Sequence, residues 1–139
     1  MFDTGKYREQ HKELQQLIRK IASAIKLEQI AKDASDTASL IAGLGAKVKV
    51  HLAMEDDYLY PRLLKQDDDD ILETTQRYID EINDINDTLN YYLGKWGSPS
   101  SIQGKPKEFI LESQDIFKKM MNRFDREEQE LYPIIEQIG

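Results

Sequence analysis

Apolar residues recur every three or four positions through most of the chain, which is the spacing of one buried helix face. This pattern predicts helices at residues 4–24, 38–64, 71–95 and 107–137, with a bent connection at residues 25–33. No segment has the pattern of a β-strand. We therefore expect an all-α protein whose four helices pack up-down-up-down as a bundle.

The connections between these helices are polar. Residues 67–70 are four consecutive aspartates, and their negative charge suits the positive N-terminal end of the helix that follows. Residues 94–108 have the density of glycine, proline and serine that is typical of a loop. No other segment is a good candidate for a linker, and 139 residues is a common length for one domain. We expect residues 1–139 to form a single domain.

A repeated motif relates the two halves of the chain. The stretch HLAMEDDYLYP at residues 51–61 matches RFDREEQELYP at residues 123–133 in its fifth residue, a glutamate, and in its final Leu-Tyr-Pro. An offset one residue shorter aligns the first helix with the third, and it places His11 at the position of Ile82. The bundle is therefore expected to consist of two related helical hairpins.

The composition limits the chemistry that the bundle can hold. The chain contains no cysteine, which excludes disulfides, iron-sulfur clusters and a cysteine nucleophile, so any metal must be bound by histidine and carboxylate. Acidic residues outnumber basic ones by 26 to 19, and the net charge of -7 disfavours binding to nucleic acid or to an anionic membrane surface. We find no signal peptide and no apolar run of membrane-spanning length, so we expect a cytoplasmic protein.

Four side chains are candidates for a polar site inside the bundle. His51 and Glu55 are four residues apart, so they share one helix face. Glu127 holds the matching position on the fourth helix, and His11 lies on the apolar stripe of the first helix. Two imidazoles with carboxylates suit non-haem iron(II), and zinc or manganese also accept such ligands. The pattern is compatible with a metal site, but His and Glu pairs at this spacing are also common on solvated helix faces.

Arg123 occupies the position in the fourth helix that matches His51 in the second. Its guanidinium stays protonated and can pair with Glu55, Glu127 or both. At about 4 Å and an effective dielectric constant of about 20, it would repel a divalent ion by roughly 8 kcal/mol. Our hypothesis is that Arg123 replaces a second cation, and the alternative is that it extends to solvent as a surface residue.

The motif His-x-x-x-Glu followed by Leu-Tyr-Pro, with its counterpart on the fourth helix, resembles the hemerythrin-like family of HHE cation-binding domains. The resemblance implies a four-helix bundle around a di-iron centre. Its ligands would be a histidine from the first helix, a histidine and a glutamate from the second, one or two histidines from the third, and a histidine and a carboxylate from the fourth. By motif position, the family ligands that this chain retains are His11, His51, Glu55 and Glu127.

Two of the family's ligands are missing from this chain. Ile82 takes the place of the third-helix histidine, and Arg123 takes the place of the fourth-helix histidine. In the family these two histidines serve the same iron, so the resemblance implies that at most one metal ion is bound here, iron if any. Tyr7 lies one turn before His11, and Tyr78 lies one turn before Ile82. We expect both tyrosines to support the site from outside the ligand set.

The resemblance implies a domain that binds or senses a small diatomic ligand or a metal ion, with oxygen, nitric oxide or iron redox chemistry as its substrate class. A second interpretation is a metal-free interaction or regulatory module, in which Arg123 neutralises the buried acids and the bundle serves a protein partner. Catalysis by a mononuclear iron site ranks lowest, because the sequence indicates no substrate pocket and no second acid-base pair. We expect binding rather than turnover.

Overall fold

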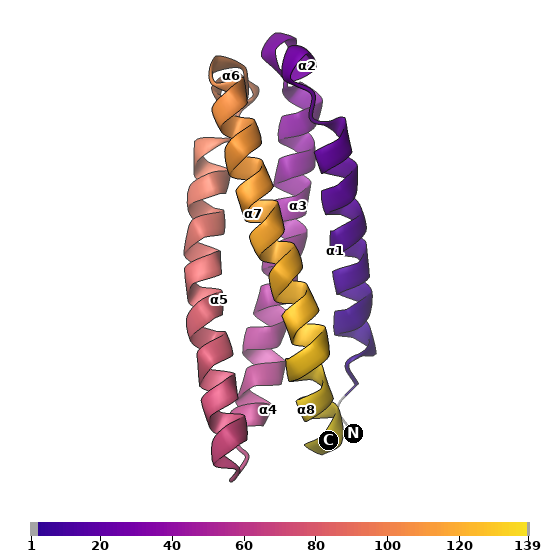
Figure 1. Cartoon of the computed structure of the whole chain (residues 1–139), viewed down its shortest axis with the longest axis vertical. Helices are drawn as coiled ribbons and strands as arrows, with labels where there is room; N and C mark the ends of the chain where they lie inside the picture. Colours follow the sequence, from indigo (N-terminus) through magenta and orange to yellow (C-terminus); the bar gives the residue numbers. More distant parts are fainter. Residues whose placement is uncertain (1–2, 139) are drawn as a thin grey trace.

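The long helices of the chain lie side by side along one axis (Figure 1). The computed structural model describes residues 3–138. Its long helices are α1 (Gly5–Ala24), α3 (Ser35–Met54), α5 (Asp69–Lys95) and α7 (Pro106–Arg126). Both α1 and α5 contact α3 and α7. The expected all-α helical bundle is therefore confirmed.

Both α3 and α7 continue beyond a single π-helical turn. The turn η1 (Glu55–Leu59) joins α3 to α4 (Tyr60–Leu64), and η2 (Glu127–Leu131) joins α7 to α8 (Tyr132–Ile138). In each case the tyrosine after the turn donates its backbone N–H to the carbonyl of the glutamate five residues earlier. The proline after each tyrosine has no N–H, so the repeated Leu-Tyr-Pro motif lies where the helical hydrogen bonds change register.

Two segments that were expected to connect the long helices contain short helices of their own. The predicted bent connection at residues 25–33 includes α2 (Leu27–Lys32). The predicted loop at residues 94–108 includes α6 (Pro99–Gly104). These two helices contact each other and close one end of the bundle (Figure 1). The loop prediction was therefore wrong at residues 99–104, whereas residues 25–33 do connect two long helices but contain a short helix.

Burial and capping explain why these short helices form. Ile30 in α2 and Ile102 in α6 are 1% and 0% exposed, and they belong to the same apolar cluster. The side chain of Ser98 accepts a hydrogen bond from the backbone N–H of Ser101, which satisfies a free donor at the start of α6. A buried isoleucine therefore anchors each short helix to the end of the core.

The second and third long helices begin earlier than expected. Whereas the apolar pattern predicted starts at residues 38 and 71, α3 begins at Ser35 and α5 begins at Asp69. The carboxylate of Asp68 accepts hydrogen bonds from the backbone N–H groups of Asp70 and Ile71. The last two aspartates of the acidic run are therefore helical, because the aspartate before them caps the helix.

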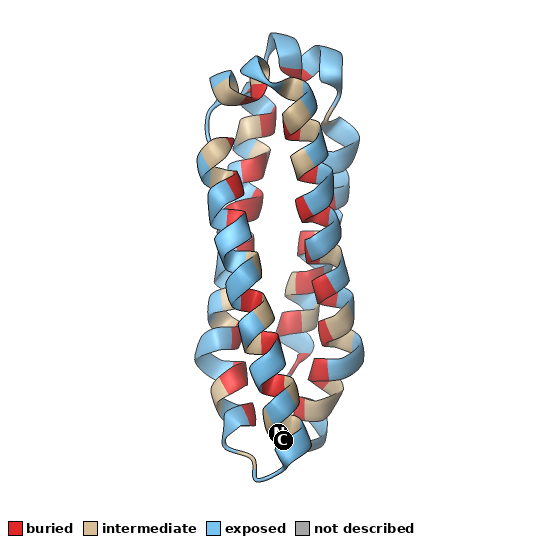
Figure 2. Cartoon of the chain, turned by 60° about the vertical axis from the view of Figure 1, so that its left-hand side comes forward, coloured by how far each residue is buried: buried red, intermediate tan, exposed pale blue. Residues whose placement is uncertain are grey.

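Buried residues line the inner faces of the long helices (Figure 2) and form two apolar clusters. The upper cluster lies beneath α2 and α6 and includes Leu14, Ile30, Trp96, Ile102 and Phe109. The lower cluster consists of Tyr7, Leu59, Tyr60, Leu63, Tyr78, Ile82, Leu131, Tyr132 and Ile135. On α1, the buried His11 lies between Tyr7 of the lower cluster and Leu14 of the upper one. A polar layer therefore separates the two clusters.

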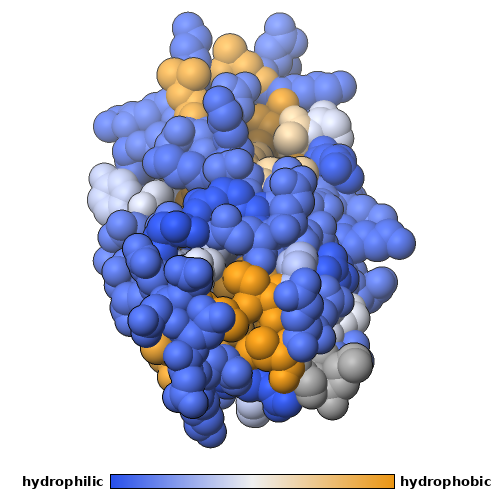
Figure 3. Space-filling model, turned by 60° about the horizontal axis from the view of Figure 1, so that its bottom comes forward, coloured by the Kyte–Doolittle hydropathy of each residue, from blue (hydrophilic) through white to orange (hydrophobic). Residues whose placement is uncertain are grey.

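The end of the bundle opposite α2 and α6 exposes some hydrophobic side chains (Figure 3). Figure 3 views this end, where hydrophobic atoms reach the surface among hydrophilic ones. Ile71, Ile134 and Ile138 are partly buried here and pack against the lower cluster.

Within residues 3–138, no helix combines the length and the apolarity that crossing a membrane requires.

Candidate metal centre

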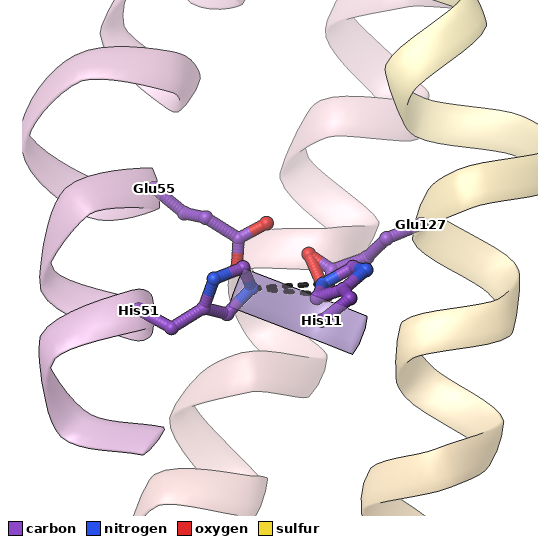
Figure 4. Close-up of side chains that lie close together, drawn as sticks. All are labelled: His11, His51, Glu55 and Glu127. Atoms are coloured by element: carbon purple, nitrogen blue, oxygen red, sulfur yellow. Dashed lines mark hydrogen bonds and ion pairs between the residues drawn. The ribbon is translucent and has the colours of Figure 1, made fainter. Parts of the chain in front are cut away.

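Four polar side chains point toward one another in the layer between the two clusters (Figure 4). They are His11 from α1, His51 from α3, Glu55 from η1 and Glu127 from η2. One ligand atom of each lies within 4.8 Å of those of the other three. His51 is 1% exposed and the others are 0% exposed. The structure therefore brings together all four residues that the sequence singled out.

The spacing of the donor atoms fits a single metal ion. Nε2 of His11 lies 2.9 Å from Nε2 of His51 and 3.3 Å from Oε1 of Glu127. Nε2 of His51 lies 3.3 Å from Oε1 of Glu55 and 3.9 Å from Oε1 of Glu127. Neighbouring ligands at about 2.1 Å from one ion are roughly 3.0–3.4 Å apart. One cation in the middle of the group could therefore reach all four side chains with small adjustments.

A hydrogen-bond acceptor lies beside the outer nitrogen of each histidine. Nδ1 of His51 is 2.7 Å from the amide oxygen of Gln10, and Nδ1 of His11 is 3.4 Å from a carboxylate oxygen of Glu128. An acceptor at Nδ1 favours the tautomer with its proton there, which leaves a lone pair on Nε2. Both lone pairs then face the centre, and at 2.9 Å they repel each other unless a proton or a metal cation lies between them.

Carboxylate oxygens in the centre lack hydrogen-bond partners. Among residues 3–138, Oε1 of Glu55 and both side-chain oxygens of Glu127 are buried and accept no hydrogen bond. A buried charged oxygen without a partner is costly, so such an atom calls for an explanation, and an ion is one. The donor set therefore fits a cation, because it consists of nitrogen and oxygen ligands and because the cation would give these carboxylate oxygens a partner.

Without a metal ion, protons are distributed unevenly within this group. Burial raises the pKa of Glu55 to about 8, and the charge of Glu127 contributes to the shift. Burial lowers the pKa of His51, but Glu127 and Glu55 outweigh that effect and raise the pKa to about 9. Burial and the charge of His51 lower the pKa of His11 to about 4. A proton on His51 thus supplies a positive charge where a metal ion would supply more.

Arg123 is buried beside the centre, with its side chain 2% exposed. Its Nε lies 3.8 Å from Oε1 of Glu127. Its guanidinium donates hydrogen bonds to the hydroxyl of Tyr60 at 2.8 Å, to the backbone carbonyl of Tyr78 at 3.0 Å and to the carboxylate of Glu81 at 3.3 Å. The alternative that Arg123 extends to solvent is therefore wrong, and its charge lies next to the acids of the site.

Tyr7 and Tyr78 brace the backbone beside the two glutamates. The hydroxyl of Tyr7 donates to the carbonyl of Met54 at 3.3 Å, and that of Tyr78 donates to the carbonyl of Arg126 at 3.1 Å. These carbonyls directly precede Glu55 and Glu127. Burial raises the pKa of both tyrosines to about 12, so both hydroxyls stay protonated donors. Ile82 lies in the lower cluster, where its side chain offers no ligand atom.

Two other tyrosines, Tyr60 and Tyr132, contact the polar group, and neither was singled out from the sequence. The hydroxyl of Tyr132 lies 3.0 Å from Nε2 of His11 and 3.1 Å from Oε2 of Glu55, while Tyr60 accepts its hydrogen bond from Arg123. Each tyrosine lies five residues after the glutamate of its π turn. In an uninterrupted α-helix, that spacing would turn the tyrosine away from the glutamate, but the extra residue of the π turn restores it to the same side. The repeated Leu-Tyr-Pro motif was the sequence signal for this feature.

Comparison with known proteins agrees with the fold and with the donor set. The family described as hemerythrin HHE cation binding domain matches residues 4–135, a span that includes every candidate ligand. Searches of curated proteins and of solved structures found no match. Since the family match covers far more than half of the chain, this protein belongs to the hemerythrin HHE cation-binding domain family.

Proposed function

We propose that this domain binds one iron ion through His11, His51, Glu55 and Glu127, and that it uses the ion to bind or sense oxygen, nitric oxide or the metal itself. One observation carries the proposal. Buried carboxylate oxygens without hydrogen-bond partners surround two imidazole nitrogens that are 2.9 Å apart. A single cation would satisfy both the oxygens and the nitrogens.

Two residues of the second hairpin, which comprises α5 to α8, favour one bound ion over two. Ile82 contributes only hydrocarbon at the position that matches His11, and Arg123 contributes a fixed positive charge at the position that matches His51. At about 4 Å and an effective dielectric constant of about 20, that charge opposes a second divalent ion by roughly 8 kcal/mol. The same charge offsets one of the two carboxylates, so the group suits one divalent ion better than two.

The donor set and its burial support iron and a small ligand. Two imidazoles and two carboxylates form a nitrogen and oxygen set that iron(II) accepts while keeping a coordination position for another molecule. Iron bound in this way supplies a position that oxygen or nitric oxide can occupy. Because all four side chains are buried, only a molecule of this size would reach the ion without separating the helices.

Metal analysis of the full chain after anaerobic reconstitution with iron(II) tests the proposal. We expect about one iron per chain, and we expect Glu55→Ala or His51→Ala to abolish binding because each removes a ligand. Asp57→Ala is the matched control for Glu55→Ala, since Asp57 lies in the same π turn but is exposed. Equal iron content in Glu55→Ala and in the unmodified protein would reject the proposed ligand set.

The alternative function is a metal-free interaction or regulatory module. One observation favours it: each buried glutamate already has a nitrogen partner that can carry a positive charge, since Nε2 of His51 lies 3.3 Å from Glu55 and Nε of Arg123 lies 3.8 Å from Glu127. A folded protein that takes up no iron after reconstitution would support this alternative. The same experiment therefore separates the two functions.

A further inference from the structure

We propose that the side-chain oxygen of Tyr132 is an additional ligand of the metal ion when the site holds iron(III). This inference rests on the proposed function, because it requires an ion already held by the four histidine and glutamate side chains. Neither the ligand pattern of the sequence nor the family resemblance assigns Tyr132 to the ligand set. The proposal starts from where its hydroxyl lies.

The hydroxyl of Tyr132 occupies a ligand-like position at the edge of the group. It lies 3.0 Å from Nε2 of His11 and 3.1 Å from Oε2 of Glu55. Adjacent ligands of an octahedral ion are about 3.0 Å apart when each lies about 2.1 Å from the metal. The tyrosine ring is 0% exposed and stacks on the imidazole of His11, with ring centroids 5.2 Å apart. Packing therefore holds the oxygen one ligand spacing from Nε2 of His11, within reach of an ion bound to that nitrogen.

The other tyrosines of the lower cluster have their hydroxyls engaged differently. Those of Tyr7 and Tyr78 donate to backbone carbonyls. That of Tyr60 accepts a hydrogen bond from the guanidinium of Arg123, which would oppose a metal cation at the same oxygen. Of these four tyrosines, Tyr132 is the one whose hydroxyl lies within hydrogen-bond range of two proposed metal ligands, His11 and Glu55.

Charge explains why the phenolate form would accompany iron(III). The two carboxylates and Arg123 together carry one net negative charge, so iron(II) leaves one net positive charge and iron(III) leaves two. Coordination by Tyr132 forms an iron-oxygen bond, breaks the O–H bond and releases the proton to solvent. The net charge of the buried site then returns to its value with iron(II), which a low-dielectric interior favours. Tyr132 is therefore expected to stabilise the ferric state.

The visible absorption spectrum of the ferric protein tests this ligand independently of any activity. The full chain is loaded with iron(II), oxidised with ferricyanide and freed of excess reagent, and its iron content and spectrum are measured together. Phenolate bound to iron(III) gives a charge-transfer band in the visible, which a mononuclear ferric ion held by imidazole and carboxylate alone does not give. We expect this band in the unmodified protein.

Tyr132→Phe keeps the ring and removes the oxygen. We expect this variant to retain about one iron per chain, to lose the visible band completely and to have a higher iron(III)/iron(II) reduction potential. The matched control is Tyr60→Phe, which makes the same change at the equivalent position of the first π turn and should keep the band.

The outcomes separate this inference from the proposed function. One iron per chain with no visible band in the unmodified protein, or a band that survives in Tyr132→Phe, overturns the Tyr132 assignment and leaves the iron site standing. If the unmodified protein takes up no iron, both proposals are wrong. Should Tyr132→Phe fail to fold, resonance Raman spectra of the unmodified protein decide, because tyrosinate ring vibrations are enhanced only if a tyrosine binds the iron.

Discussion

The first helical hairpin, α1 to α4, and the second, α5 to α8, have the same arrangement of helices and π turns but different polar chemistry. The first provides two imidazoles and a carboxylate, from His11, His51 and Glu55. At the matching positions the second provides an isoleucine, a guanidinium and a carboxylate, from Ile82, Arg123 and Glu127. The first hairpin therefore provides lone pairs that can bind a metal cation, whereas the second contributes the positive charge of Arg123.

The tyrosines after the π turns show how the two hairpins depend on each other. Tyr60 of the first hairpin accepts a hydrogen bond from Arg123 of the second. Tyr132 of the second hairpin lies within hydrogen-bond distance of His11 and Glu55 of the first. The same π turn therefore places a tyrosine hydroxyl next to a positive charge in one case and next to candidate metal ligands in the other. What differs between the hairpins is charge and not architecture.

The largest expected effect comes from removing the charge that distinguishes the second hairpin. In the metal-free protein, Arg123→Met removes the permanent positive charge beside the buried Glu127 and takes a hydrogen-bond donor from Tyr60 and from the Tyr78 carbonyl. Removing one partner of a buried ion pair typically costs about 3–5 kcal/mol, and we expect a loss of that size in the free energy of unfolding. Urea unfolding in the presence of a chelator measures it.

Arg126→Met is the matched control for this experiment. Arg126 pairs with the same Glu81 as Arg123 does, but its side chain is 39% exposed. Exposed ion pairs contribute up to about 1 kcal/mol, so this variant should lose no more than that. Equal losses in Arg123→Met and Arg126→Met would show that Arg123 does not neutralise the buried acids.

A second experiment makes the hairpins chemically alike. The double variant Ile82→His with Arg123→His provides two imidazoles beside Glu127 and removes the repelling charge. We expect the iron content to rise from one to two per chain. Free iron at 100 times the dissociation constant of the new site should stabilise the fold by about 2.7 kcal/mol. Metal analysis and unfolding at several iron concentrations measure both effects.

The single variant Ile82→His separates the missing ligand from the repelling charge. Because Arg123 is still present, this variant should remain at one iron per chain. A double variant that also remains at one would mean that positions 82 and 123 do not face a second metal position.

Removing the hydroxyl that meets Arg123 should have a smaller effect than removing the charge. Tyr60→Phe deprives the guanidinium of one acceptor, although the Tyr78 carbonyl and Glu81 still accept from it. Loss of one hydrogen bond to a charged group suggests a decrease of about 1.5–3 kcal/mol in the free energy of unfolding. Iron content should stay unchanged, because Tyr60 contacts Arg123 and not the iron ligands in the first hairpin. Urea unfolding measures the change in stability, and parallel metal analysis measures the iron content. A fall in bound iron would contradict the assignment of Tyr60 to Arg123 and not to the metal ligands.

The long helices and the convergence of the four polar residues could be predicted from the sequence, because both depend on regular spacing. His11 and His51 lie on apolar helix faces, and the repeat places Glu127 at the position of Glu55. Helical periodicity is a strong signal over twenty residues. It then brings side chains far apart in the sequence to one level of the bundle.

Features that interrupt or fall short of this periodicity could not be predicted. The helices α2 and α6 have six residues each, too few to show a period, and they are held by the burial of Ile30 and Ile102. The π turns add one residue to a helical turn, so α-helical spacing alone would place Tyr60 and Tyr132 on the side away from the site. Contacts across helices, such as that of Gln10 with His51, depend on packing that no local pattern reports.

The smallest effect concerns an exposed connection between the hairpins near the two ends of the chain. Glu136 of the second hairpin accepts a hydrogen bond from the hydroxyl of Thr4 at 2.8 Å and another from the guanidinium of Arg8 at 2.9 Å. The bond from Thr4, and then that from Arg8, lower the pKa of Glu136 in the folded protein. A carboxyl whose pKa is lower when folded stabilises the protein above its unfolded pKa, and this contribution is lost as the pH falls through the folded pKa.

Glu136→Gln should therefore destabilise the protein slightly at neutral pH and have no effect in acid. The side chains of Arg8 and Glu136 are 37% and 41% exposed, so solvent screening limits the loss at pH 7 to less than about 1 kcal/mol. Thermal unfolding of both proteins across the acidic range measures the difference, which should also shrink at high salt. A difference that persists at pH values where Glu136 is protonated would mean that the contact acts through packing and not through charge. Side-chain packing would then hold the two hairpins together at this end, in contrast to the charged layer at the centre of the bundle.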